Sequence, residues 1–256
     1  MKRLLIGDNR EKLLVTLETI LRHWGYRTLV SSNPPRLTSL VTETTPDLLI
    51  FGESLLRDNP APLAERVQER VSRGTPLLLM PEHNSSAPYL SAHEILAVPV
   101  DIFNLFEKIQ KHLEKHPRKN IRLALQLPGM LCLGDRCHLA EVLSLSTRGV
   151  FIKTGFRLKK GDSFSITFPL LGMKKELEVA GRVLYCVRPD PDNNFLQGVG
   201  VEFIDPDRGT LILLESFLES CFLDELPSQS GKKLVAEYCF RGSTEKPTLH
   251  LSHPAP

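Results

Sequence analysis

Residues 46–51 read Pro46-Asp47-Leu48-Leu49-Ile50-Phe51, a short run of apolar residues behind a proline and an aspartate. Such a run is typical of a strand that is buried on both faces of a parallel sheet. Four similar runs indicate further strands at 2–6, 27–32, 76–80 and 95–98. Helical spacing of apolar residues, or a proline at the start, predicts helices at 11–24, 35–44, 63–72 and 101–115. The alternation predicts an α/β domain with a doubly wound parallel sheet.

After residue 115 the pattern changes to short strands separated by Gly, Asp and Pro. The predicted strands are 123–127, 130–133, 137–145, 149–153, 163–168, 175–187 and 196–204. Pro128-Gly129 and Gly134-Asp135 are among the turn signals between them. Many short strands favour a small antiparallel β-barrel, which an amphipathic helix over 207–223 would close.

The sequence therefore predicts a multidomain chain with its boundary at His116-Pro117. We expect an α/β domain over 1–115, a linker over 116–122, and a β-barrel with its C-terminal helix over 123–225. The polar tail over 226–256 has no sustained period, so we expect it to be largely mobile, although 233–240 could pair as a stray strand.

Composition excludes several classes of protein. The chain has 256 residues, and its 32 Lys and Arg against 30 Asp and Glu leave a net charge of +2, too small for a protein that coats nucleic acid. No apolar run approaches the roughly 20 residues that cross a bilayer, and Gly7 to Glu11 interrupts the first one too early for a signal peptide. Five scattered cysteines favour reduced thiols. We expect a cytoplasmic protein without membrane insertion.

Three segments of the N-terminal domain carry a family resemblance: Lys2-Arg3-Leu4-Leu5-Ile6, residues 46–51, and Pro99 before the last helix. With these segments, residues 1–115 resemble the receiver domain of two-component response regulators. Members of that family hold magnesium with acidic residues after the first strand and accept phosphate on an Asp after the third. A Ser or Thr after the fourth strand and a Lys before the proline complete the family's site.

The chain departs from this pattern at three positions. Gly52 stands at the position of the phosphoacceptor Asp, Pro81 at that of the Ser or Thr, and Val98 at that of the Lys. None of these side chains can attack or neutralise a phosphoryl group, so we infer a pseudo-receiver that serves as a docking or dimerisation module. Asp8 and Asn9 keep part of the metal-binding pair, but we expect a polar strand end there and no metal site.

A second constellation lies at the start of the C-terminal half. Arg118 and Arg122 form an Arg-x-x-x-Arg pair just before the first barrel strand. The polar stretch 144–149 follows 22 residues beyond Arg122 and reads Ser-Leu-Ser-Thr-Arg-Gly, and Gly198 opens the later stretch Gly-Val-Gly-Val-Glu-Phe. Together these features resemble the PilZ domain, whose signatures are RxxxR and, further on, Asp/Asn-x-Ser-x-x-Gly. The resemblance spans about residues 117–223.

The resemblance implies a receptor for cyclic di-GMP. Two arginines can pair their planar guanidinium groups with phosphate oxygens and with guanine O6 and N7. The binding residues that it implies, with Arg148 added as a phosphate contact, are Arg118, Arg122, Ser144, Ser146, Arg148, Gly149 and Gly198. Ser144 departs from the motif, since it replaces Asp or Asn. One lost hydrogen bond to a guanine edge would weaken binding by about 1–3 kcal/mol without abolishing it.

The remaining chemistry-bearing residues give weaker signals. Glu53 lies one residue beyond the acceptor position, where strand alternation points its side chain elsewhere. Cys132, Cys137 and His138 lack a fourth metal ligand at a suitable spacing, so we expect buried thiols and no metal. Glu82-His83 is interpreted as a solvated loop. No catalytic motif is present, so we expect no enzyme and no cofactor.

Three functions are consistent with this layout. The first is a bacterial cyclic di-GMP effector in which ligand binding changes the interdomain arrangement and the binding of a protein partner or of a second copy through the pseudo-receiver. The second is an interaction adaptor that has lost the ligand, for which Ser144 is the main support. The third, a DNA-binding response regulator, lacks a helix-turn-helix output in the β-rich half, so we expect no DNA partner.

Overall fold

The computed structural model describes the chain except for residues 59, 82–91, 195, 227–231, 233–234 and 237–256. The described residues divide into two compact units. The N-terminal unit contains residues 1–119 and the described residues from 223 onward, and the barrel unit contains residues 120–222.

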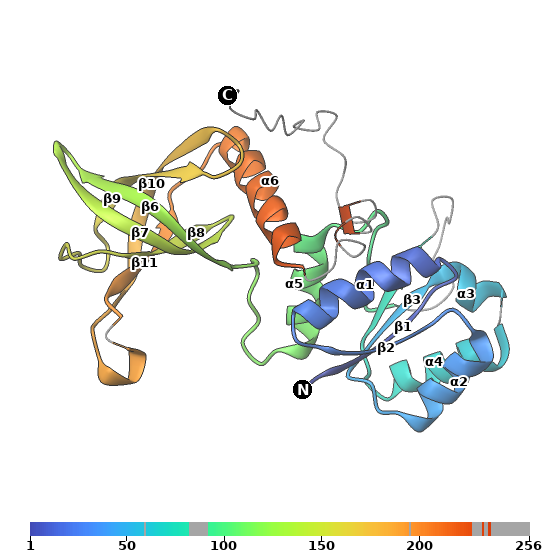
Figure 1. Cartoon of the computed structure of the whole chain (residues 1–256). Helices are drawn as coiled ribbons and strands as arrows, with labels where there is room; N and C mark the ends of the chain where they lie inside the picture. The colour runs from blue at the N-terminus through green and yellow to red at the C-terminus, as the bar shows by residue number, and fades with distance from the viewer. Residues whose placement is uncertain (59, 82–91, 195, 227–231, 233–234, 237–256) are drawn as a thin grey trace, which may run out of the picture. The chain divides into compact units, whose positions relative to one another are not determined.

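The N-terminal unit is built on a five-stranded parallel sheet (Figure 1). Its strands are β1 (Arg3–Gly7), β2 (Arg27–Ser31), β3 (Leu48–Gly52), β4 (Leu77–Met80) and β5 (Glu94–Ile95). Their order, β2-β1-β3-β4-β5, is a doubly wound order of the flavodoxin-like type, which confirms the predicted fold class. The last strand is shorter than the predicted 95–98.

Helices cover both faces of this sheet. They are α1 (Glu11–His23), α2 (Pro34–Glu43), α3 (Glu53–Asp58), α4 (Glu65–Ser72), which a π-helical turn (Pro60–Ala64) precedes, and α5 (Ile102–Leu113). In Figure 1, α1 and α5 lie on one side of the sheet and α2 and α4 on the other. The short helix α3 was not predicted, because six residues are too few to display a helical period.

The core follows from the alternation of side chains along the strands. Leu5, Leu49 and Leu79 belong to one buried cluster with Leu37 of α2 and Val67 of α4, and all five are fully buried. Their strand neighbours point to the opposite face and are also fully buried. Burial on both faces explains why the strands read as continuous apolar runs.

Two helix ends show why helix boundaries could be predicted from the sequence. Gly25 has φ +85° after α1, its N–H donates to the Arg22 carbonyl, and the Tyr26 N–H donates to the Leu21 carbonyl. This is the Schellman arrangement, which favours glycine at that position. At the start of α2, the Asn33 side chain accepts a hydrogen bond from the Arg36 N–H at 2.9 Å.

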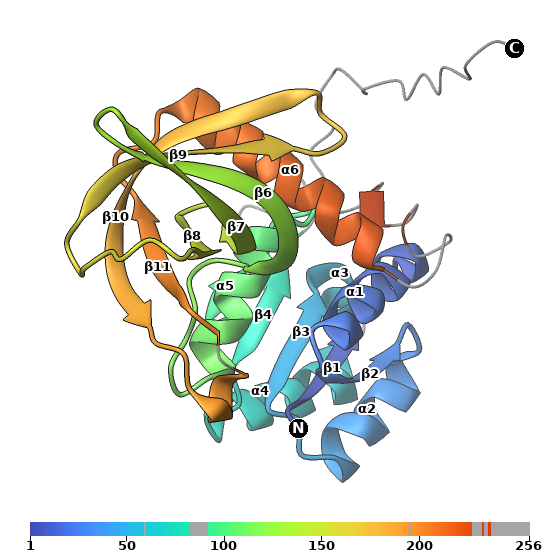
Figure 2. The same cartoon turned by 60° about the vertical axis from the view of Figure 1, so that its left-hand side comes forward.

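The second unit contains a closed antiparallel barrel with the order β10-β11-β8-β7-β6-β9 (Figure 2). Its strands are β6 (Leu123–Leu133), β7 (Arg136–Ser146), β8 (Gly149–Lys153), β9 (Ser163–Leu170), β10 (Lys175–Val187) and β11 (Gly198–Phe203). A 3-10 turn (Pro191–Asn193) precedes β11, and the helix α6 (Arg208–Glu225) follows it. The predicted barrel and C-terminal helix are confirmed.

The predicted turn at Pro128-Gly129 is wrong, because both residues lie inside β6. Pro128 pairs with Glu141 of β7, whereas the pairing of β6 with β9 begins only at Met130. At Pro128 the strand therefore has a ladder on one side, where a residue without an N–H is tolerated. One continuous strand replaces the two predicted ones.

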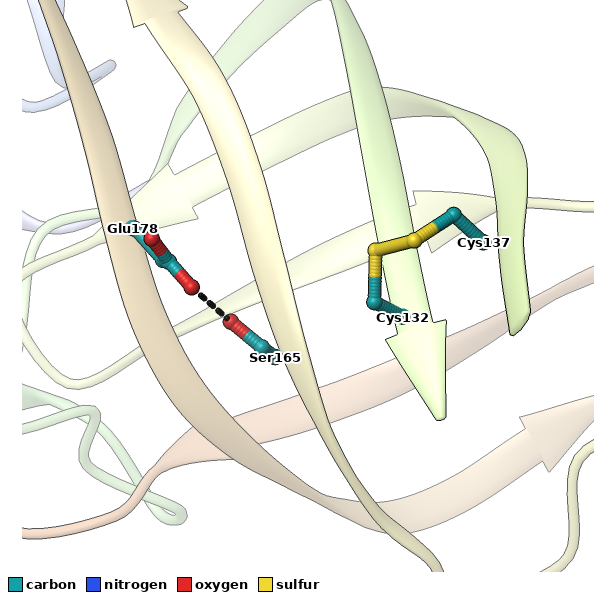
Figure 3. Close-up of a disulfide and its surroundings, with 4 residues drawn as sticks. All are labelled: Cys132, Cys137, Ser165 and Glu178. Atoms are coloured by element: carbon teal, nitrogen blue, oxygen red, sulfur yellow. Dashed lines mark hydrogen bonds between the residues drawn. A yellow bond between two sulfur atoms is a disulfide. The ribbon is translucent and has the colours of Figure 1, made fainter. Parts of the chain in front are cut away.

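The prediction of reduced, buried thiols is wrong for Cys132 and Cys137. The two residues face each other across the β6–β7 hairpin and form a disulfide (Figure 3). Cys137 is exposed and Cys132 is partly exposed. The hairpin turn between them brings two residues of adjacent strands within bonding reach, which the spacing in the sequence did not reveal. Cys186 and Cys221 are reduced.

Some sequence predictions lie wholly or mostly outside the described residues. These are the Glu82-His83 loop and most of the tail with its stray strand, of which Val235 and Ala236 are described as helical and Val235 is fully buried. Among the described residues, no helix combines the length and the apolar character that are needed to cross a bilayer.

Candidate functional site

The two arginines of the RxxxR pair lie in the segment that leads into β6. Both are exposed, and the Arg118 N–H donates to Gln110 Oε1 at 3.2 Å within the N-terminal unit. Within the barrel unit, Asn120 accepts a hydrogen bond from Thr147 Oγ1 at 3.2 Å. Thr147 belongs to the polar turn between β7 and β8, so this bond holds the segment between the two arginines against that turn.

The polar turn is a tight two-residue hairpin between Ser146 and Gly149. Ser146 is 5% exposed, and its Oγ donates to the Gly149 carbonyl at 3.0 Å while it accepts from the Arg148 N–H at 3.4 Å. The Arg148 carbonyl accepts from the Phe203 N–H at 2.9 Å. These bonds fix the backbone of the turn, and the exposed Arg148 side chain lies on the surface.

The glycines of the motif are explained by strand packing. A Cβ at Gly149 would lie 2.2 Å from the Val201 carbonyl oxygen, and a Cβ at Gly198 would lie 2.5 Å from the Ile152 carbonyl oxygen. Strands β8 and β11 therefore approach each other too closely for a side chain at either position. Both glycines therefore have a role in closing the barrel, and the ligand contacts predicted for them stay predictions.

Ser144 belongs to a row of outward-facing residues that crosses four strands. Strand register places Ser144 opposite Phe151, Phe151 opposite Gly200, and Gly200 opposite Tyr185. The Phe151 and Tyr185 rings are stacked with centroids 6.3 Å apart and planes inclined by 24°. Tyr185 is 44% exposed, and a Cβ at Gly200 would lie 2.2 Å from its ring, so the ring lies directly over the glycine backbone. We refer to Ser144, Phe151, Gly200 and Tyr185 as the outer row.

Sequence reasoning missed the two aromatic residues of the outer row. They are 34 residues apart in the chain, and only the register of β8, β11 and β10 brings them together. Within the residues that the structure describes, the guanidinium groups of Arg118, Arg122 and Arg148 form no ion pair. The barrel unit itself thus offers the exposed cations of Arg122 and Arg148, a hydroxyl group and an aromatic surface, which are groups that suit phosphates and bases.

The structure also describes the end of β3, where the resemblance to receiver domains places the phosphoacceptor. Gly52 ends β3, and Glu53 begins α3 with its side chain 1% exposed and paired with Arg57 at 2.6 Å. Asp8 is fully buried and is paired with Arg10. The described residues contain no cluster of three or more His, Cys, Asp or Glu that could hold a metal ion.

A separate charged cluster lies at the edge strand β5. Glu94 accepts hydrogen bonds from the ammonium groups of Lys108 and, at 2.6 Å, Lys111, and His112 Nε2 lies 3.3 Å from the same carboxylate. Burial opposes ionisation of this carboxyl, but the two lysines outweigh it and lower the pKa of Glu94 to about 2. The cluster joins β5 to α5.

One family model matches part of the chain. Residues 115–220 match the family model described as PilZ domain. No curated protein matches the chain.

Similar solved structures include the inhibitor of motility MotI/DgrA of Bacillus subtilis, at 15% identity and TM-score 0.38 over 43% of this chain and 53% of that one. YcgR of Escherichia coli in complex with c-di-GMP matches at 14% identity and TM-score 0.36 over 41% and 45%. The chain thus covers about half the length of each of these two proteins. The response regulator TrrA of Thermotoga maritima in complex with Mg2+ and BeF matches at 21% identity and TM-score 0.38 over 44% and 100%.

Proposed function

We propose that this chain, whose residues 115–220 match the PilZ domain, is a cytoplasmic cyclic di-GMP effector without enzymatic activity. The observation that carries the proposal is the Asn120–Thr147 hydrogen bond, because it holds the RxxxR segment against the Ser-x-Ser-x-x-Gly turn. The matched residues include both of these elements, which agrees with the proposal.

In this proposal the arginines hold the phosphates and the guanine edges. Arg118, Arg122 and Arg148 are exposed and can pair bidentately with phosphate oxygens or with guanine O6 and N7. Ser146 and Gly149 act indirectly, since their bonds and packing shape the turn that presents Arg148. Gly198 acts in the same way through the packing of β11.

The outer row takes a base. Ser144 offers a hydroxyl group to the edge of a guanine, and the exposed ring of Tyr185 offers a face on which a base can stack. Stacking of a base on an aromatic ring contributes about 1–3 kcal/mol. Such a contact can offset part of what the replacement of Asp or Asn by Ser144 costs.

In this proposal the segment that contains Arg118 couples ligand binding to the N-terminal unit. Arg118 is anchored to α5 by its bond to Gln110, whose Nε2 donates to the Tyr26 hydroxyl at 3.1 Å. Drawing Arg118 onto a ligand strains this anchor, so binding changes the arrangement of the two units and the surface presented to a partner. The N-terminal unit serves as a docking or dimerisation module for an unidentified protein or a second copy, with no phosphorylation.

Calorimetric titration of cyclic di-GMP into the intact chain tests the receptor function. We expect binding that Arg118→Ala abolishes and that Ser144→Asp tightens about tenfold to a hundredfold. Arg136→Ala is the matched control, because Arg136 is an exposed arginine at the opposite end of the β6–β7 hairpin and should not affect affinity. Small-angle scattering of the same samples should show a change of dimensions on saturation.

The second candidate is a ligand-independent interaction adaptor. Ser144 favours it, because the usual carboxylate or amide is absent from the motif. An absence of heat change at high micromolar cyclic di-GMP in both the wild type and Ser144→Asp would favour the adaptor over the receptor.

A further inference from the structure

Asp8 lies directly after β1, where receiver domains hold a divalent metal ion. Its side chain is fully buried, so its charge must be balanced from within the protein. A buried carboxylate without a countercharge is strongly destabilising.

Arg10 engages both oxygens of this carboxylate. Arg10 Nε donates to Asp8 Oδ1 at 2.8 Å, Nη2 donates to Oδ2 at 2.7 Å, and the Arg10 backbone N–H donates to Oδ1 at 2.8 Å. This is a bidentate guanidinium–carboxylate pair, the strongest common type of charged hydrogen bond. A metal ion would have to displace the guanidinium to reach either oxygen.

The opposite side of Asp8 is closed by β3. A Cβ at Gly52 would lie 2.2 Å from Asp8 Oδ2 and 2.8 Å from its Cγ. The carboxylate of Asp8 therefore occupies the space in which a second acidic side chain would have to stand. Magnesium sites need several oxygen ligands in near-octahedral geometry, and these residues do not fit one.

We propose that Arg10 takes the place of the divalent cation beside Asp8, so that the charge of this buried carboxylate is balanced without a metal ion. The guanidinium supplies the positive charge, and Gly52 provides the room into which Asp8 turns. The site then has no vacancy for a metal-dependent switch. This inference is independent of ligand binding by the barrel.

Urea unfolding of the full chain, followed by the fluorescence of Trp24, tests this proposal. Trp24 is the single tryptophan and packs on Phe106 with ring centroids 5.2 Å apart, so its emission reports on the N-terminal unit. We expect the wild-type midpoint to be the same with EDTA and with millimolar magnesium. We expect Arg10→Gln to lower the midpoint, and Asp8→Asn in the same chain to recover part of the loss.

Arg22→Gln is the matched control, since Arg22 is an exposed arginine paired with Glu18 on α1 and its loss should shift the midpoint little. A wild-type midpoint that rises with magnesium would overturn the proposal. So would losses that simply add in the Asp8→Asn, Arg10→Gln double variant, because a shared ion pair must couple them.

Discussion

Replacement of Gly149 by alanine should destabilise the barrel itself, even without ligand. The added Cβ would lie 2.2 Å from the Val201 carbonyl oxygen, whereas carbon–oxygen contacts between strands are normally about 3.3–3.6 Å. The strands must separate by about 1 Å to accommodate it. Strand β8 is paired with β7 on one side and with β11 on the other, so it cannot move freely.

The expected cost is at the upper end of the range for overpacking, about 2–3 kcal/mol. That corresponds to a roughly thirtyfold to 150-fold larger open population of β8 and β11. Hydrogen–deuterium exchange on peptides from these two strands measures this population directly, and urea unfolding followed by circular dichroism measures its effect on stability.

Gly129→Ala provides the matched control in the same barrel. A Cβ at Gly129 would have its nearest neighbour, the Thr167 carbonyl oxygen, at 3.5 Å, which is an ordinary contact. Alanine there should be neutral or stabilise the fold by up to about 1 kcal/mol, because it restricts the unfolded chain. Equal exchange rates in the two variants would refute the reasoning from strand spacing. Equal rates would also leave the predicted ligand contact as the reason for glycine at position 149.

Three further measurements concern other parts of the chain. The pKa of Glu94 is lowered to about 2 in the folded state. Its contribution to stability is therefore present above the ordinary pKa of about 4.3 and is lost as the pH falls towards 2. The urea midpoint of the wild type should fall over this pH range, and the midpoint of Glu94→Gln should lack this fall. Arg70 donates to three carbonyls at the end of α2, so Arg70→Ala should cost about 1.5–3 kcal/mol, whereas the exposed Arg66→Ala should cost little, as urea unfolding will show. Reduction of the Cys132–Cys137 disulfide should lower the free energy of unfolding by about 2 kcal/mol, and unchanged stability in dithiothreitol would contradict this.

Much of the architecture was predictable because local chemistry and tertiary structure agree. The strand that contains residues 48–51 reads as a continuous apolar run since both of its faces are buried. Gly25 ends α1 where a left-handed residue is needed, and Asp101 caps α5 by accepting hydrogen bonds from two backbone N–H groups. Such signals are confined to a few neighbouring residues, so a single sequence displays them.

The errors arose where the decisive partner is distant in sequence. Pro128-Gly129 was interpreted as a turn because proline and glycine usually interrupt a strand. Proline is tolerated here because β9 does not pair with that part of β6, and this pairing is known only once the barrel is formed. The disulfide depends on the hairpin register, and the Phe151–Tyr185 stack depends on three strands. The departures at Gly52 and Ser144, in contrast, were visible in the sequence, although the role of Arg10 beside Asp8 was not.

Under the proposed function, Ser144 has a consequence for selectivity between nucleobases. A carboxylate at this position can only accept hydrogen bonds, so it favours the donor-rich edge of guanine over adenine. A hydroxyl group both donates and accepts, and it rotates to suit either base. In a barrel with serine at this place in the outer row, discrimination must come from the arginines, which recognise guanine O6 and N7. Adenine-containing cyclic dinucleotides should therefore compete with cyclic di-GMP more effectively for the wild-type chain than for Ser144→Asp.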